Sequence, residues 1–217
     1  MSQPEEHPPG PFDMLRDRRA MVDTTVAPIA FVIVYTITKE VNVAAAVAVG
    51  IGIALFVERL VRRKPVINAI GGLFAIALAA FIAVRSGNAE GFFWPKVAQQ
   101  GGLFVIFAGS VVVRRPLTGF IVAQLYRADP EWQKIPEVRR VMSEYTLIWA
   151  SLFLLRAVVF LVGILAGKVG FLGVAVLVMG LPAFGVLLFF GYRWVPKRLE
   201  QLGAPDPRHP EAPETAP

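Results

Sequence analysis

The chain has 217 residues, of which 55% are hydrophobic and 18% are charged. Ordinary soluble domains carry about 25% charged residues, and this chain also contains several apolar runs of nearly twenty residues. It is therefore expected to be an integral membrane protein and not a soluble domain. The formal net charge of +6 lies mainly in segments that flank the apolar runs. That placement is typical of membrane topology and argues against nucleic-acid binding.

Six apolar runs predict six membrane-spanning helices. Residues 1–12 precede them and are expected to be a disordered, Pro-rich tail. Short polar turns separate the first span from the second and the fifth from the sixth. We therefore predict an all-α, polytopic membrane helix bundle of three hairpins over residues 13–198, with residues 199–217 as a second disordered tail. The expected spans are 22–38, 41–57, 66–84, 91–113, 145–167 and 169–192.

The segment 117–144 lies between the fourth and fifth spans and is predicted to form interfacial or cytoplasmic helices. Its apolar beginning, 117–126, is too short to cross a membrane and favours an interfacial or re-entrant helix. Pro136 is a good first residue for a helix. We expect the helix that begins there to continue without a break into the fifth span.

The basic residues predict the orientation of the spans. If the N-terminus is cytoplasmic, sixteen Lys and Arg residues flank the spans on the cytoplasmic side. The opposite side carries four, which are Lys39, Arg85, Lys96 and Lys168. The positive-inside rule then predicts that both termini are cytoplasmic.

Arg156 is the one charged residue in the fifth span and lies near its middle. A guanidinium at that depth costs roughly 2.5 to 3.5 kcal/mol on insertion scales, so the folded protein has to compensate for it. Gly163 and Gly167 share its helical face at small-xxx-small spacing, which indicates that this face contacts protein. Three partners remain open: backbone carbonyls of a broken helix, Asp23 or Glu58 reached by a snorkelling side chain, or an anionic ligand.

Small residues recur at every fourth position in the second span. Such a stripe allows close packing of helices, and the third and fourth spans carry similar patterns. A second interpretation is that polar residues among them line a cavity, and it makes Asn68, Gln99, Gln100 and Arg156 candidate ligand-binding residues. The stripe of the second span consists of Asn42, Ala46, Gly50, Ala54 and Glu58.

Charged residues near the cytoplasmic ends of the spans predict a network at the inner surface. Glu58 and Arg62 are spaced for an ordinary helical ion pair. The network would either anchor the spans at the level of the lipid headgroups or form a pocket whose arginines bind an anionic headgroup. Its expected members are Asp23, Glu58, Arg62, Arg63, Arg114 and Arg115.

Motifs of enzymatic chemistry are missing from the sequence. It has no G-x-S-x-G, H-E-x-x-H or P-loop pattern, and no cysteine. Both histidines, His7 and His209, lie in the Pro-rich tails. We therefore expect no catalytic residues, no metal site and no cofactor, and the evidence leans against an enzyme.

Five short segments carry a family resemblance. They are Arg18–Asp23, Arg62–Pro65 with Asn68 and Gly71–Gly72, Phe92–Lys96, Arg114–Gly119 and Trp149–Arg156. Together they resemble an actinobacterial family of uncharacterised multi-spanning membrane proteins, itself loosely similar to the intracellular septation protein A type. The resemblance covers about residues 16–195. It implies a location in the bacterial plasma membrane and offers no catalytic residue to transfer.

Two functions from different classes follow from these observations. The first is an accessory or scaffold component of envelope or division processes, and the alternative is a small transporter or a lipid- or anion-binding carrier with Arg156 at the binding site. A cavity that reaches Arg156 would favour the carrier, whereas a closed core that satisfies Arg156 would favour the scaffold. The expected partners are the lipid bilayer, an anionic lipid, and a second copy or other membrane proteins, without nucleic acid.

Overall fold

Helices build the whole structure, and no strand occurs in the part of the chain that is described. The computed structural model describes residues 18–62, 67–126 and 128–207. The expected all-helical fold is therefore confirmed over these ranges. In chain order, the elements are α2 (Arg18–Thr38), α3 (Val41–Val61), α4 (Ile67–Ser86), η1 (Ala89–Phe93), α5 (Trp94–Val112), α6 (Leu117–Tyr126), η2 (Pro130–Lys134), α7 (Pro136–Leu165), α8 (Val169–Val178) and α9 (Leu181–Gln201).

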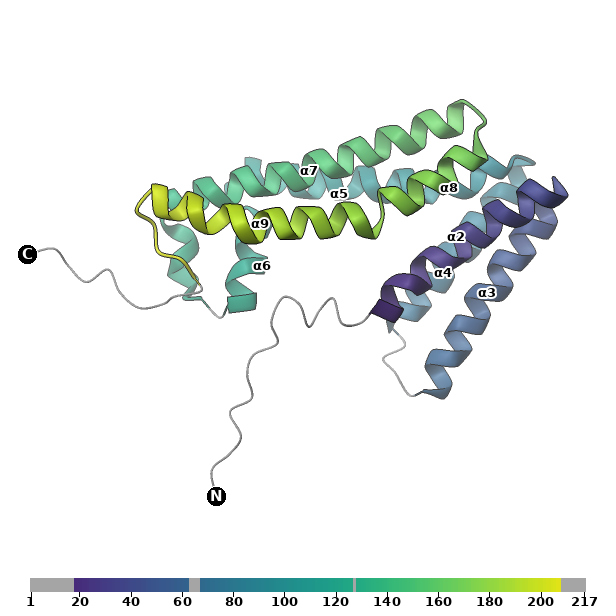
Figure 1. Cartoon of the computed structure of the whole chain (residues 1–217), viewed down its shortest axis with the longest axis horizontal. Coiled ribbons are helices and arrows are strands. Elements are labelled where there is room, and N and C mark those ends of the chain that lie inside the picture. The colour runs from purple at the N-terminus through teal and green to yellow at the C-terminus, as the bar shows by residue number, and fades with distance from the viewer. Residues whose placement is uncertain (1–17, 63–66, 127, 208–217) are drawn as a thin grey trace, which may run out of the picture.

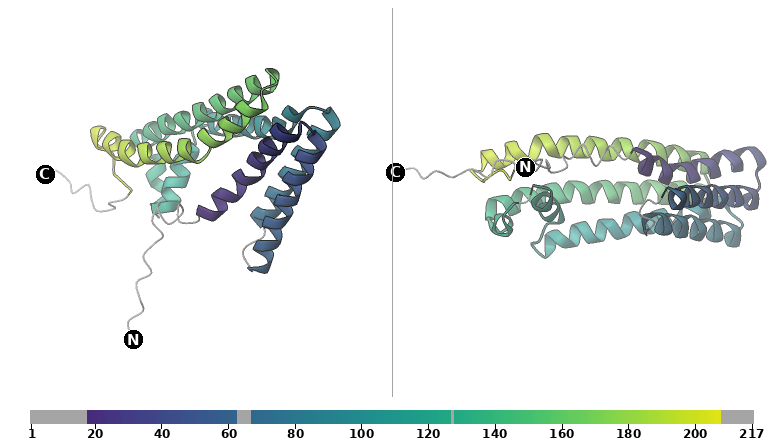
Figure 2. Two further views of the ribbon diagram at one scale, coloured as in Figure 1. Left: turned by 45° about the vertical axis from the view of Figure 1, so that its right-hand side comes forward. Right: turned by 90° about the horizontal axis from the view of Figure 1, so that it is seen from below.

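The helices form two arms that meet at one end of the molecule (Figures 1 and 2). The first arm consists of α2, α3 and α4, and the second arm consists of α5 to α9. The α2–α3 turn, the η1 segment and the α7–α8 turn all lie at the end where the arms meet (Figure 1). Away from this junction the arms diverge, so their free ends lie far apart.

An aromatic cluster fills the junction between the arms. Phe31 of α2 stacks on Phe92 of η1 with ring centroids 4.1 Å apart, and Phe93 stacks on Phe160 of α7 at 6.5 Å. All four rings are buried. Aromatic pairs of this kind contribute beyond the area they bury, by about 0.5 to 1.5 kcal/mol each. The cluster therefore fixes how the first arm is attached to the second.

A second cluster holds the helices of the second arm together. Trp149 and Phe153 of α7 contact Phe107 of α5 and Phe184 of α9, with ring centroids between 5.0 and 6.4 Å apart. Leu187 and other buried residues of α9 complete it. The face of α7 that carries Arg156 is thus the face that packs, as the small-residue spacing predicted.

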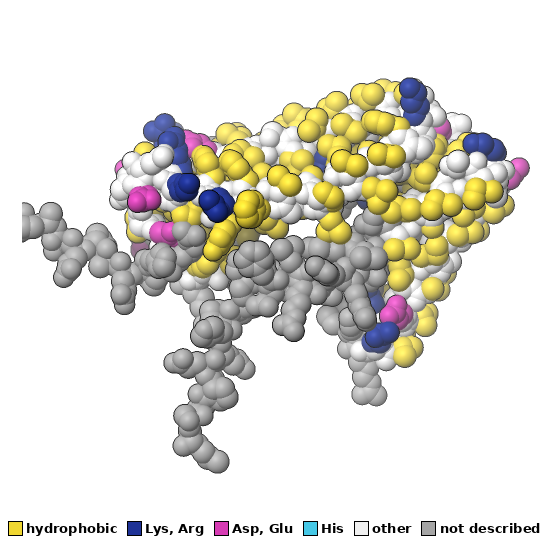
Figure 3. Space-filling model, viewed as in Figure 1, with side chains coloured by type: hydrophobic (Ala, Val, Ile, Leu, Met, Phe, Trp, Pro, Cys, Tyr) yellow, Lys and Arg dark blue, Asp and Glu magenta, His cyan; other side chains and the backbone are white. Residues whose placement is uncertain are grey.

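Several described helices are suited to a membrane. Three are long and apolar enough to cross one: Val41–Val61, Pro136–Leu165 and Val169–Gln201. A fourth span exists if Ala89–Val112 and Leu117–Tyr126, bent by 87°, count as one. Figure 3 shows hydrophobic side chains spread over the visible face of the molecule. These features suggest association with a membrane, while six spans in three hairpins remain a prediction.

The sixth predicted span is divided in two, which the sequence analysis did not expect. Helix α8 ends at Val178 and α9 begins at Leu181, with Pro182 in its first turn. Proline has no N–H to continue the hydrogen bonds of the preceding helix, and its ring clashes with the carbonyl four residues earlier. The predicted sixth span, 169–192, therefore contains a break, although the candidate span Val169–Gln201 includes both helices. In contrast, α7 runs unbroken from Pro136, as predicted.

The expected C-terminal tail was also too long. Residues 199–201 belong to α9, and the segment after it folds back onto η2, where the Trp132 indole Nε1–H donates to the Pro205 carbonyl at 2.8 Å. Leu199 is fully buried. Packing against this indole orders a segment whose proline content predicted disorder. The remaining residues of this tail, 208–217, and the predicted N-terminal tail, 1–12, lie outside the described residues.

The small-residue stripe of the second span does not pack within the described bundle. Its members, Asn42, Ala46, Gly50, Ala54 and Glu58, are all exposed on α3. The face of α3 that packs instead carries Ala44, Ala45, Ala48 and Gly52. Because α3 contains so many small residues, two of its faces permit close contact, and the pattern alone did not identify the one that is used.

Candidate functional site

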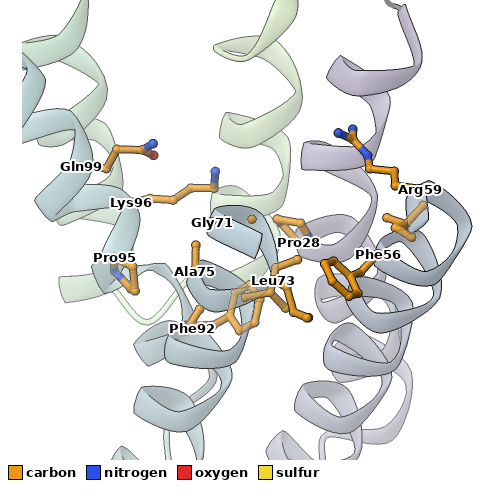
Figure 4. Close-up of a pocket in the computed structure, with 15 residues that line it drawn as sticks. Pro28, Phe56, Arg59, Gly71, Leu73, Ala75, Phe92, Pro95, Lys96 and Gln99 are labelled. Carbon is orange, nitrogen blue, oxygen red and sulfur yellow. The ribbon is translucent and has the colours of Figure 1, made fainter. Parts of the chain in front are cut away.

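A cavity of about 470 Å³ lies between the two arms. Its walls come from α2, α3, α4, η1 and α5. Figure 4 shows Lys96 and Gln99 on α5 facing Arg59 on α3, so that the three polar groups gather at one end of the cavity. The rest of the wall is apolar and includes Phe92 and Leu73. The cavity thus has a basic end and an apolar body.

Local sequence explains how α5 presents its polar groups. Pro95 lies in the first turn of α5, a position that suits proline because the helix needs no N–H bond there. Lys96 and Gln99 follow it and share one helical face at i, i+3 spacing. Gly71 and Gly72 on α4 leave open space at the opposite wall. The cavity therefore arises where small residues on one arm face long polar side chains on the other.

Arg156 lies inside the second arm with 7% of its surface exposed. Its guanidinium carbon is 4.9 Å from the centre of the Phe184 ring of α9, a cation–π geometry. The Nε and Nη1 groups are buried and have no hydrogen-bond partner in the described structure. A cation–π contact does not replace the hydrogen bonds of a buried guanidinium, so two donors remain available.

Gln100 is buried in the same seam. It is 5% exposed, and its Oε1 atom also lacks a hydrogen-bond partner in the described structure. Contacts of Phe93 with Phe160 and of Phe107 with Phe153 show that α5 and α7 run antiparallel. Gln100 and Arg156 lie between these contacts on their respective helices, so an unpartnered acceptor and two unpartnered donors share one level of the bundle.

Lys96 lies on the cavity wall, close enough to Arg156 for the two positive charges to repel each other. Neither side chain forms an ion pair with a described Asp or Glu. Arg156 lies about 14 Å along α7 from its end at Leu165, at the rise of an α-helix. Lys96 lies about 3 Å from the start of α5. Two cations thus lie near the cavity without a counterion among the described residues.

The structure brings together only part of the predicted ligand-binding set. Gln99 lines the cavity, whereas Gln100 and Arg156 lie behind its wall. The side chain of Asn68 lies outside the described residues. Lys96, which was counted among the charges of the outer side, and Arg59 also line the cavity, and neither was among the predicted ligand-binding residues. The spacing of Lys96 with Gln99 and Gln100 on one face of a span was the signal that could have identified the first.

The predicted charge network is not a single cluster in the described structure. Glu58 and Arg62 form the expected ion pair at 2.9 Å, but both side chains are about half exposed, and such pairs contribute little to stability. Arg114 and Arg115 are exposed at the end of α5, which belongs to the other arm (Figure 1). The side chains of Asp23 and Arg63 lie outside the described residues.

Comparison with known proteins identifies a family but no activity. Searches of curated proteins and of solved structures gave no match. The family described as "Protein of unknown function (DUF3159)" matches residues 17–201, a range that includes both arms and every site residue named above. The chain therefore belongs to this DUF3159 family.

Proposed function

We propose that this protein binds the headgroup of an anionic lipid in the cavity between its two arms. The observation that carries the proposal is a pair of cations without a described carboxylate partner, Lys96 on the wall of a cavity of about 470 Å³ and Arg156 behind that wall. This is the carrier class of function, with the binding site extended to include Lys96.

Electrostatics supports an anionic ligand. A buried charge destabilises a protein unless it is paired, and the penalty grows when two like charges are close. A phosphate or carboxylate at the basic end of the cavity would offset the charge of Lys96 directly and, through the wall, part of the charge of Arg156. The Lys96 ammonium would donate to its oxygen atoms, and charge-assisted bonds of this kind are about twice as strong as neutral ones. Gln99 can supply a further amide donor.

The shape of the cavity supports a ligand with an apolar portion. Below the basic end, the wall consists of apolar side chains such as Phe56, Leu73 and Ile76. A lipid can bury a chain there while its headgroup contacts Lys96. Because the arms diverge away from the junction, the headgroup would enter from their free ends, which the positive-inside rule assigns to the cytoplasmic side.

Native mass spectrometry of protein purified in mild detergent tests this proposal. Lys96→Gln and Arg156→Leu should each reduce the retained anionic lipid about tenfold, the effect of losing roughly 1.4 kcal/mol of binding free energy. Lys168→Gln removes an equal charge from the exposed α7–α8 turn and should leave retention unchanged. Equal retention by all four proteins would contradict the proposal.

The proposed setting is a bacterial plasma membrane. Six spans over 13–198 with both termini cytoplasmic agree with the basic residues, since the α2–α3, α4–η1 and α7–α8 turns carry few of them. In this arrangement the junction of the arms would face away from the cytoplasm.

A scaffold role in envelope or division processes is a second candidate, and one observation favours it. The stripe that includes Ala46, Gly50 and Ala54 is exposed on α3, and a side-chain Cβ at Gly50 would meet nothing within 4 Å. Such a face could pair with a second copy or with another membrane protein. Oxidative cross-linking of Gly50→Cys in membranes would support pairing, with the lipid-facing Phe74→Cys as the control.

A further inference from the structure

A second groove, separate from the cavity between the arms, lies within the second arm. It has a volume of about 450 Å³ and is bounded by α5, α6, α7, α9 and residues 206–207. Tyr145, Trp149, Phe153 and Phe184 line it. Along α9 it extends from Phe184 to Pro196, about 18 Å at the rise of an α-helix. The groove is long, narrow and aromatic.

The few polar groups of the groove wall are already engaged. The Tyr145 hydroxyl donates to the Leu187 carbonyl at 3.1 Å, and the Thr118 hydroxyl donates to the Met142 carbonyl at 3.0 Å. A polar occupant would therefore find little to bind along the wall. An apolar chain would instead gain from burial against the aromatic rings.

A charged hollow of about 480 Å³ adjoins this groove. Tyr192, Pro196 and Asp206 line both spaces, so the two lie side by side. The hollow carries cations at Arg193 and Lys197, and carboxylates at Glu200 and Asp206. Within the described residues Arg193, Lys197 and Glu200 form no ion pair. A basic and an acidic group thus lie together at the mouth of an apolar groove.

We infer that the groove and the hollow together bind one phospholipid with a zwitterionic phosphoethanolamine headgroup. One acyl chain occupies the groove beside Trp149 and Phe153. The phosphate accepts hydrogen bonds from Arg193 and Lys197, and the ammonium group donates to Glu200. The mixed charge distinguishes this site from the cavity between the arms, where Lys96 and Arg156 favour a net negative headgroup. The inference does not depend on the proposed function, because the two sites share no residue.

Lipid competition in native mass spectrometry tests the headgroup assignment. The full-length protein would be offered equimolar phosphatidylethanolamine, phosphatidylcholine and phosphatidylglycerol with the same acyl chains. We expect phosphatidylethanolamine to be retained about tenfold over phosphatidylcholine, because a trimethylammonium group has no N–H to donate to Glu200. Glu200→Gln should remove this preference, and Lys96→Gln should leave it intact. No preference, or a preference for phosphatidylglycerol that Arg193→Gln abolishes, would overturn the inference.

A matched pair of substitutions tests whether the groove holds the chain. Leu188→Trp places a large side chain on the groove wall, whereas Val186→Trp places one on the exposed face of α9, away from the groove. Only the first should reduce phosphatidylethanolamine retention, by about tenfold. Equal retention by both variants would overturn the inference. Much tighter lipid binding by a protein truncated after Pro207 would also overturn the inference. The C-terminal residues would then be the natural occupant of the groove.

Discussion

At the scale of single residues, Arg156 is the most unusual feature of the molecule. It is more than nine-tenths buried, and its Nε and Nη1 nitrogens have no hydrogen-bond partner among the described residues. A buried charge that stabilises the fold would normally be matched by hydrogen bonds or by a carboxylate. Both are absent in the described structure, so a binding role for Arg156 is a prediction that can be tested separately from its effect on stability.

Replacement of Arg156 by leucine separates the two roles. Replacing a poorly compensated buried charge with an apolar side chain is often neutral or stabilising. We therefore expect Arg156→Leu to unfold in detergent at the same Tm as the wild type or a few degrees above it. Arg85→Leu, at an exposed position, is the control. A Tm lowered by more than about 5 °C would show that the guanidinium has structural partners.

Gly163 illustrates a second effect at the residue scale. A Cβ atom at this position would lie 2.6 Å from Cδ2 of Leu172 and 3.0 Å from Cδ1 of Phe171. Leu172 is fully buried in the junction core and has little room to move. Gly163 therefore allows α7 and α8 to approach closely.

We expect Gly163→Ala to lower the free energy of unfolding by about 1 to 3 kcal/mol, the usual effect of overpacking. Gly102→Ala is the matched control, because a Cβ there would meet nothing within 4 Å. Thermal unfolding followed by circular dichroism in detergent would compare the two. Identical Tm values for both variants would contradict the close contact between α7 and α8.

At the scale of elements, the break between α8 and α9 has the clearest consequence. It places Phe184 in the first turn of α9, where its ring covers the guanidinium of Arg156. Gly180 occupies the break, and a Cβ on it would lie 2.5 Å from the carbonyl oxygen of Val176. That oxygen belongs to the backbone and cannot rotate away as a side chain could.

Gly180→Ala should therefore disturb the break and lower Tm by several degrees, an effect of at least about 1 kcal/mol. Gly185→Ala lies one turn further along α9 and has open space for the new methyl group. It should have no such effect. If the break positions Phe184 over Arg156, Gly180→Ala should also change anionic lipid retention. A normal Tm and normal retention would mean that the break tolerates a side chain and does not position Phe184.

At the scale of the whole molecule, the arrangement of the arms determines which regions can meet. The junction unites three turns, while the free ends are separated (Figure 2). If the junction lies on one side of the membrane, the α4–η1 turn and η2 have to be accessible from opposite sides. The chain contains no cysteine, so single cysteines can be introduced without a background.

Labelling with a membrane-impermeant maleimide in intact cells tests this topology. Asn88→Cys, in the α4–η1 turn, should react from outside the cell, whereas Glu131→Cys, in η2, should react only after the membrane is opened. Both positions are exposed. Labelling of both from the same side would contradict the orientation and the predicted number of spans.

Much of the local structure could be predicted from the sequence. The apolar runs predicted helices, Pro136 predicted the start of α7, and the spacing of Glu58 and Arg62 predicted their ion pair. The glycines on the same side of the helix as Arg156 predicted that this face of α7 packs against protein. These features depend on helical periodicity and on residues close in sequence, which a single chain displays directly.

Three features could be found only from the tertiary structure. They are the position of Lys96, the divergence of the arms and the identity of the buried face of α3. Lys96 resembles an ordinary charge at the end of a span until α5 is seen beside the cavity. The attachment of one arm to the other depends on how Phe31, the neighbours Phe92 and Phe93, and Phe160 pack, and these three positions are far apart in the sequence. Hydropathy and periodicity assign each helix its length and its apolar faces. Which of those faces meet is decided by side-chain packing between helices, and the sequence pattern does not encode that packing locally.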